Sequence, residues 1–116
     1  MKIKLITSLL LGSVILLNAS NDGAKLLEEK CATCHFLSSS KNKMVAPPMW
    51  GVTKTVNTHF KTQEESMEFI MDYTMNPSED KMVFPVSTKK LFGLMPSMKD
   101  KLTKDELRTI VEYLYP

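Results

Sequence analysis

The segment Cys31-Ala32-Thr33-Cys34-His35 places two cysteines three residues apart and follows the second one directly with a histidine. Residues three positions apart lie on the same face of a helical turn, so both sulfurs are available to one partner. This spacing is typical of c-type haem attachment, in which both thiols add to vinyl groups of the porphyrin. The motif predicts that Cys31 and Cys34 bind haem covalently and that His35 ligates its iron.

Two other chemistries are open to the same three side chains. A Cys-x-x-Cys pair can act as a redox dithiol, because the motif lowers a cysteine pKa and permits disulfide exchange. The adjacent His35 and the lack of an alternating strand and helix pattern disfavour this interpretation. A structural zinc site needs four ligands, and the motif offers three. The haem interpretation is therefore preferred.

The first residues have the pattern of a secretory signal. Lys2 and Lys4 form a basic start, an apolar run extends over residues 5–17, and two small residues follow. A helix over the apolar run would span about 20 Å, which is shorter than the ~30 Å hydrocarbon core of a bilayer. We therefore expect a signal peptide, cleaved after Ala19 or Ser20, in preference to an uncleaved anchor.

Removal of residues 1–19 leaves one expected domain, residues 20–116. The whole chain has 15 basic and 13 acidic side chains, so losing Lys2 and Lys4 leaves 13 of each. This near-neutral balance does not favour nucleic acid as a partner. The domain is small for a self-sufficient core, so we expect an apolar cofactor to support the fold. No membrane span is expected after signal removal.

Helix signals occur along the whole domain. Asn21 or Asp22 can cap a helix over residues 23–30, and residues 36–49 have the composition of a loop. A capping box at Thr62 and Glu65 opens a second helix, which ends at Asn76-Pro77. A shorter helix is predicted over about 86–92 and is ended by Gly93, and a second capping box, Thr103 and Glu106, opens the last helix. No strand pattern is present, so the predicted class is all-α.

Met95 is the proposed sixth ligand of the iron. It stands between a helix-ending glycine and a proline, in a turn that can direct a thioether towards a metal. Met98 is the next choice. Met67, Met71 and Met75 are spaced by four residues and are interpreted as a buried helix stripe. His59 lies in a polar stretch and is interpreted as exposed, with iron ligation as the less favoured alternative.

The sequence resembles the small monohaem class I cytochromes c of bacteria over nearly the whole domain. Four pieces carry the resemblance, and they are Gly23 and Leu27 with the haem motif, Ala46-Pro47-Pro48-Met49-Trp50-Gly51, Gly93-Leu94-Met95-Pro96, and Glu112-Tyr113-Leu114. The resemblance implies a cytochrome c-like fold of about four helices around one covalent haem, with the N- and C-terminal helices crossing. It also implies that the Pro47 carbonyl accepts a hydrogen bond from His35.

Two departures from the family pattern are visible. Leu27 stands where the family usually has an aromatic residue, so the helix crossing loses a ring contact. The stretch from Val52 to Phe92 is longer than in the smallest relatives and is only loosely matched. No individual role is carried over to residues 53–90.

The function implied by the resemblance is single-electron transfer between respiratory redox proteins by a monomeric, periplasmic carrier that converts no substrate itself. Two alternatives stay open: a haem enzyme or ligand sensor with a displaceable sixth ligand, and a haem subunit of a larger oxidoreductase. The Trp50 indole N–H is a candidate for a contact with a haem propionate, with core packing as the alternative. Five lysines flank the methionine segment and would steer an acidic partner, unless they are only solvated helix ends; they are Lys89, Lys90, Lys99, Lys101 and Lys104.

Overall fold

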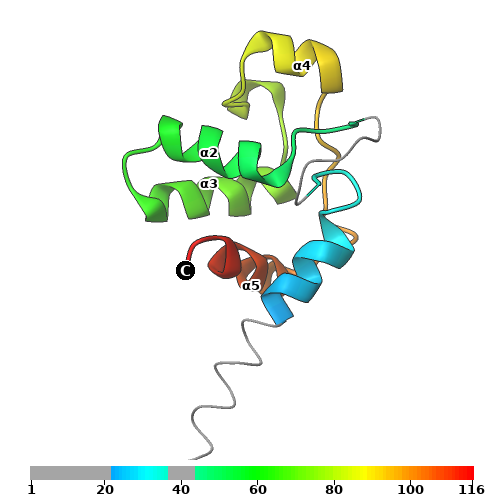
Figure 1. Cartoon of the computed structure of the whole chain (residues 1–116), viewed down its shortest axis with the longest axis vertical. Coiled ribbons are helices and arrows are strands. Elements are labelled where there is room, and N and C mark those ends of the chain that lie inside the picture. The colour runs from blue at the N-terminus through cyan, green and yellow to red at the C-terminus, as the bar shows by residue number, and fades with distance from the viewer. Residues whose placement is uncertain (1–21, 37–43) are drawn as a thin grey trace, which may run out of the picture.

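The computed structural model describes residues 22–36 and 44–116, and all regular structure in these ranges is helical. The predicted signal peptide, residues 1–19, lies outside the described residues. In chain order the elements are an N-terminal helix described over 22–30, α2 (Met49–His59), α3 (Gln63–Met75), the 3₁₀ helix η1 (Glu79–Lys81), α4 (Val86–Phe92) and α5 (Lys104–Leu114) (Figure 1). The all-α prediction is confirmed, with five α-helices in the described ranges where about four were expected.

Both predicted capping boxes are present. The Thr62 hydroxyl accepts a hydrogen bond from the Glu65 N–H, and the Glu65 carboxylate accepts one from the Thr62 N–H. Thr103 and Glu106 form the same reciprocal pair at the start of α5. Each box satisfies donors that the first turn of a helix leaves without a partner. These helices therefore begin where the local sequence predicts.

The end of α4 also follows the local sequence. Gly93 has φ of 75°, a backbone conformation that residues with a side chain rarely adopt. Its N–H donates to the Lys89 carbonyl at 2.8 Å, which closes the last turn of the helix. The glycine thus separates α4 from the extended segment 93–98.

The helix α2 is the element that the sequence pattern does not predict. Its residues include a series of β-branched side chains, which lower helix propensity: Val52, Thr53, Thr55, Val56 and Thr58. The residue before the helix, Pro48, supplies no side-chain cap. Packing provides the compensation, because Met49 and Val56 are buried and α2 lies against α3 (Figure 1). Tertiary burial, and not local propensity, stabilises this helix.

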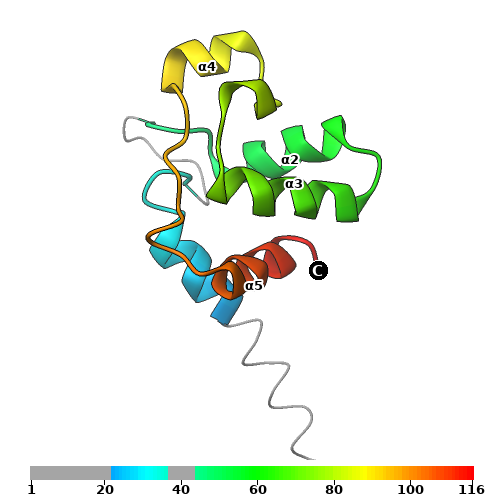
Figure 2. The ribbon, with the colours of Figure 1, turned by 180° about the vertical axis from the view of Figure 1, so that it is seen from behind.

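The core lies where the N-terminal helix crosses α5. A Cβ atom built on Gly23 would lie 2.6 Å from the Cβ of Tyr113, so the two helix backbones approach closely at this point. Figure 2 shows the crossing from behind. Six buried apolar side chains form the core cluster, and each contributes roughly 1.5–3 kcal/mol when fully removed from water; they are Leu27, Met49, Leu102, Leu107, Ile110 and Val111. The predicted crossing of the terminal helices is therefore present.

The residue after α5 ties this crossing to the α2–α3 pair. The Tyr115 hydroxyl donates to Asn57 Oδ1 at 2.8 Å, and its carbonyl accepts from Gln63 Nε2 at 3.0 Å. The aromatic ring also packs against the core cluster. The C-terminal end of the domain thus joins three helices.

The helix α4 is attached much more lightly. None of its residues is buried, and the side chains of Val86 and Leu91 are 68% and 74% exposed. One contact that attaches α4 is an ion pair at 2.8 Å between Lys89 Nζ and Oε2 of Glu79, the first residue of η1. Exposed ion pairs contribute little to stability, typically about 0–1 kcal/mol. Figure 1 shows α4 at the end of the molecule away from α5.

No helix within the described ranges combines the length and the apolar character needed to cross a lipid bilayer.

Candidate haem site

The cysteine-histidine motif forms a tight turn at the end of the N-terminal helix. The Cys31 N–H donates to the Leu27 carbonyl at 3.0 Å, and the His35 N–H donates to the Cys31 carbonyl at 2.8 Å. Both cysteines are free thiols; Cys31 is half-buried and Cys34 is exposed. The helix anchored at the crossing therefore fixes where both thiols and the imidazole emerge.

The imidazole of His35 is oriented by the loop before α2. Its Nδ1 lies 2.7 Å from the carbonyl oxygen of Pro47, and because that oxygen can only accept, Nδ1 carries the proton. The other ring nitrogen, Nε2, then holds its lone pair free for a metal. The hydrogen bond that the family resemblance implies is present in the structure.

Burial lowers the pKa of His35 below its usual value, and the hydrogen bond to the Pro47 carbonyl opposes this effect. The net direction favours the neutral imidazole at neutral pH, which is the form that ligates metals. A second contact joins the motif to α2, since the Met49 N–H donates to the Phe36 carbonyl at 2.8 Å. The turn is thus held from both sides.

The surroundings of Cys31 differ from those of a reactive dithiol. Burial, followed by the neighbouring Cys34, raises the pKa of the Cys31 thiol. Cys31 also follows the C-terminal end of a helix, where the helix dipole opposes a thiolate. Reactive Cys-x-x-Cys pairs require the opposite shift, towards the thiolate. The described residues moreover contain no group of three or more His, Cys, Asp or Glu side chains that could hold a metal ion such as zinc.

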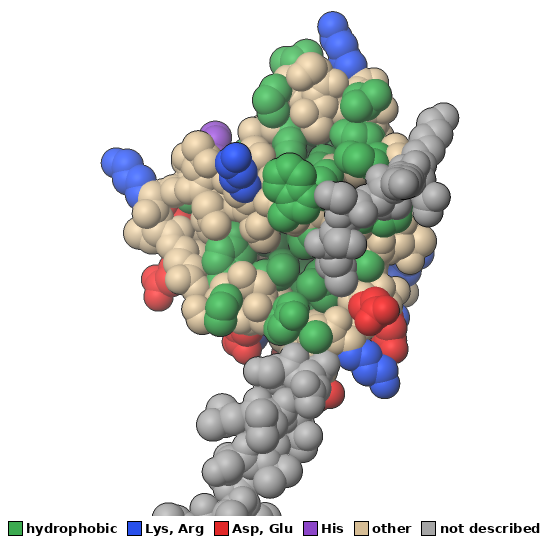
Figure 3. Space-filling view, viewed as in Figure 1, with side chains coloured by type: hydrophobic (Ala, Val, Ile, Leu, Met, Phe, Trp, Pro, Cys, Tyr) green, Lys and Arg blue, Asp and Glu red, His purple; other side chains and the backbone are tan. Residues whose placement is uncertain are grey.

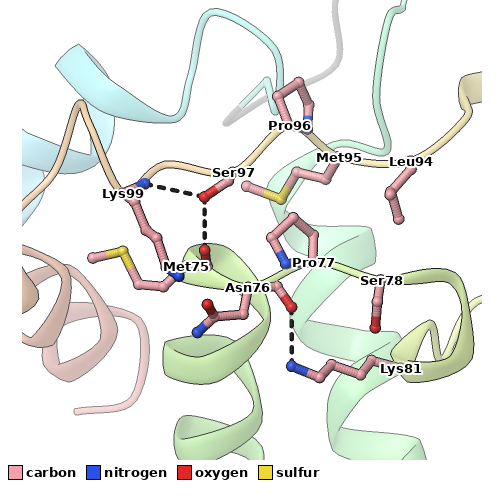
Figure 4. Close-up of a pocket in the computed structure, with 10 residues that line it drawn as sticks. All are labelled: Met75, Asn76, Pro77, Ser78, Lys81, Leu94, Met95, Pro96, Ser97 and Lys99. Carbon is pink, nitrogen blue, oxygen red and sulfur yellow. Dashed lines mark hydrogen bonds between the residues drawn. The ribbon is translucent and has the colours of Figure 1, made fainter.

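The structure separates the two candidate methionines. Met98 is half-buried and packs against the core cluster, together with Met67, Met71 and Met75. Met95 is half-buried but does not belong to that cluster. Figure 4 shows the Met95 side chain in a surface hollow that is also lined by Pro77 and Leu94. Met98 is therefore packed like the methionines of α3, whereas Met95 lines the surface hollow.

Apolar side chains beside the motif and the methionine segment are exposed. Trp50 is 58% exposed, Val45 57% and Leu94 43%. Figure 3 shows apolar side chains gathered on the face of the molecule seen in Figure 1. The core-packing alternative for Trp50 is therefore wrong. A large flat apolar group bound at the motif would cover such side chains, so the residues present fit a porphyrin.

His59 lies far from the motif. It is the last residue of α2, whereas Met49 at the start of α2 is hydrogen-bonded to Phe36. Ten residues of helix at about 1.5 Å each separate the two ends by about 15 Å. The exposed His59 ring instead packs edge-on against Phe60, with ring centroids 4.9 Å apart. The structure does not bring His59 and His35 together.

The lysines near the methionine segment are mostly at the surface. Lys89 is paired with Glu79, and the remaining four are exposed: Lys90, Lys99, Lys101 and Lys104. One further lysine, Lys81, pairs with Asp72 at 2.9 Å and also donates to the Asn76 carbonyl at 3.0 Å. Positive charge is thus available beside Met95.

One contact of the methionine segment could not be expected from local sequence. The Ser97 hydroxyl donates to the Met75 carbonyl at 2.6 Å, across 22 residues of chain. A lone serine in a loop has no spacing signal that would identify this partner. The residue matters because it follows Met95 by only two positions.

The helical fold and the motif with its oriented histidine define the class of c-type cytochrome domains. The chain belongs to the family described as cytochrome C oxidase, cbb3-type, subunit III, whose model matches residues 18–114. An uncharacterized protein of Aquifex aeolicus (strain VF5) is 28% identical over 113 residues, covering 84% of this chain and 74% of the relative. No solved structure matches the chain. The resemblance to c-type cytochromes is thereby confirmed, and the family implies a haem cofactor.

Proposed function

We propose that this protein is an exported, periplasmic electron carrier with one haem bound covalently through Cys31 and Cys34. The observation that carries the proposal is the 2.7 Å contact between His35 Nδ1 and the Pro47 carbonyl oxygen. That contact holds the imidazole of a haem-attachment motif in the tautomer and orientation that metal ligation needs. Membership of a c-type cytochrome family supports the same function.

In this proposal His35 ligates the iron through Nε2 and Met95 through its thioether. Bound haem supplies an iron that exchanges one electron between its ferrous and ferric states. The soft sulfur of Met95 favours the reduced state, and the Pro47 carbonyl raises the basicity of His35. Trp50 is placed at the start of α2, next to the Pro47 loop, where its indole N–H can donate to a propionate.

The partners in this proposal are redox proteins with an acidic docking surface. Lys90, Lys99 and Lys101 are exposed on α4 and on the chain that follows Met95. Exposed positive charge near the site of electron exchange accelerates the encounter with an acidic surface, and added salt screens it. Electron transfer by this route requires no substrate site, so the protein is proposed not to be an enzyme.

The test compares Met95→Ala with Met98→Ala in protein matured in a host that attaches haem. Mass spectrometry first establishes the added mass of one haem and the loss of residues 1–19 or 1–20. Met95→Ala should keep the haem, lose the long-wavelength charge-transfer band that methionine sulfur gives ferric haem, and lower the reduction potential by a substantial part of the ~0.8 V range set by axial ligands.

Met98→Ala is the matched control, because it removes a methionine from the core and not from the iron. It should keep the band and the potential and lose stability. The reverse pattern would transfer the ligand role to Met98. Colourless protein with the mass of the bare polypeptide would overturn the whole proposal. A wild-type ferric spectrum without the sulfur band would instead favour a haem enzyme or sensor with an open coordination position.

A second candidate function is a haem-bearing subunit of a larger oxidoreductase. The description of the family to which the chain belongs names a subunit of an oxidase. The exposed apolar side chains of Val86 and Leu91 on α4 would suit burial against another subunit. Gel filtration of the protein from its natural source distinguishes the two candidates, since a carrier elutes as a monomer and a subunit elutes with its complex.

A further inference from the structure

The segment that carries Met95 is attached to the C-terminal end of α3. A helix leaves its last four carbonyl groups without partners inside the helix. Segment 93–98 supplies two of the missing donors, since the Met98 N–H bonds to the Thr74 carbonyl at 3.0 Å and the Ser97 hydroxyl bonds to the Met75 carbonyl at 2.6 Å. Figure 4 shows the Ser97 bond beside Met95. The methionine segment thus serves as the cap of α3.

This attachment reaches Met95 through a stiff connection. Pro96 lies between Met95 and Ser97, and its ring fixes its own φ and restricts the residue before it to extended conformations. On the other side, Gly93 ends α4 at a φ of 75°, and Leu94 is exposed. The link to Ser97, which runs through Pro96, is therefore the stiffer of the two connections of Met95.

Two further polar contacts lie beside the Ser97 contact. The Ser97 oxygen also accepts a hydrogen bond from the Lys99 N–H at 3.3 Å, which turns the hydroxyl proton towards α3. Lys81 places its ammonium on the Asn76 carbonyl, where positive charge suits the C-terminal end of a helix dipole. The end of α3 is thereby a defined binding position for the segment.

We propose that Ser97 is a positioning residue that holds the thioether of Met95 in place by binding the end of α3. This inference rests on the proposed ligation of iron by Met95. Loss of the Ser97 hydroxyl leaves Met95 in the chain but allows segment 93–98 to leave α3 more often. A competing ligand such as imidazole then replaces the methionine more easily.

The experiment measures imidazole affinity of the ferric, haem-loaded protein by the loss of the sulfur band. Ser97→Ala should bind imidazole about two- to fivefold more tightly, because a surface hydrogen bond of this kind shifts an equilibrium by about that factor. Ser97→Thr keeps the hydroxyl and should restore the wild-type affinity. Ser87→Ala, at an exposed serine of α4, is the matched control and should leave the affinity unchanged.

A second measurement needs no variant. Deuterium exchange of the Met98 amide, which binds Thr74, should be slow in the wild-type protein and should become faster when imidazole displaces Met95. Coupling between two events is reciprocal, so a segment that holds the ligand is also held by it. An amide that exchanges equally fast with and without imidazole contradicts the proposal.

The outcomes separate this inference from the function on which it rests. A wild-type protein without the sulfur band overturns the ligation by Met95 and this inference together. A wild-type protein with the band, and with the same imidazole affinity in Ser97→Ala, overturns only the role of Ser97. If Ser97→Ala does not retain haem, the wild-type Met98 exchange decides the question, because it measures the attachment of the segment to α3 without any variant.

Discussion

Two parts of this molecule are built in different ways. The crossing of the N-terminal helix with α5 is a packed core, with Leu107, Ile110 and Val111 at most 2% exposed. The methionine side, α4 and segment 93–98, has no buried residue in its helix. It is held by an ion pair, by hydrogen bonds to the end of α3 and by the half-buried Met98, which packs against the core cluster. Most of the buried apolar surface therefore lies at the crossing, and the position of the proposed iron ligand depends on a few contacts at the end of α3.

Matched truncations on the two sides should show the largest difference. Ile110→Ala removes buried methyl groups from the core and should lower the free energy of unfolding by about 3 kcal/mol. Leu91→Ala removes similar atoms from a side chain that is 74% exposed and should change the free energy of unfolding by less than about 0.5 kcal/mol. Denaturant unfolding of the haem-loaded protein, followed by helical circular dichroism, measures both. Equal losses would show that α4 is packed in solution.

The close approach at the crossing gives the next effect. Gly23→Ala places a methyl group 2.6 Å from the Cβ of Tyr113, so the helices must shift, and we expect a loss of about 2 kcal/mol. Gly51→Ala is the matched control in α2, where the new methyl group meets only Pro48 at 3.6 Å. Because alanine favours a helix more than glycine does, the free energy of unfolding of this control should rise by about 0.5–1 kcal/mol. Thermal unfolding of both variants tests the opposite signs.

The smallest effect concerns the start of α5, where the methionine segment meets the core. Hydrogen bonds from the backbone and side chain of Thr103 lower the pKa of Glu106 below its usual value. A carboxyl group whose pKa is lower in the folded state stabilises the fold at pH values above its unfolded-state pKa. This stabilisation is lost as the pH falls through the folded-state pKa. As the pH is lowered, the free energies of unfolding of the wild-type protein and of Glu106→Gln should therefore approach each other.

Glu112→Gln removes an exposed carboxylate from the same helix without touching its cap. This variant distinguishes the loss of one negative charge from the loss of the capping carboxylate. A difference in the free energy of unfolding between the wild-type protein and Glu106→Gln that stays constant from neutral to acid pH would contradict the assigned role of the capping box.

Much of the fold could be predicted because its signals are local. Thr62 and Thr103 bond to groups three residues away, and Gly93 needs only its own backbone freedom. The helix α2 could not be predicted, because its β-branched residues disfavour a helix until Val56 is buried against the rest of the domain. Where propensity and packing disagreed, packing decided.

The candidate site also combines features that local sequence predicts with features that depend on packing. The haem motif is contiguous, and the partner of His35, Pro47, could be assigned from the family resemblance. The exposure of Trp50 and the packing of Met98 against the core cluster were open in the sequence, because both depend on which face of an element meets its neighbours. The contact of Ser97 with α3 had no sequence signal.

The sequence by itself determined the haem motif, from which the haem chemistry is proposed, and the ends of most helices, since these depend on residues within one or two turns of each other. The tertiary structure alone decided which methionine of segment 93–98 packs against the core cluster, which end of a helix receives that segment, and where α2 forms. Those outcomes depend on atoms brought together from distant parts of the chain, such as Ser97 and Met75. Burial and hydrogen bonding between such atoms exist only once the helices have packed.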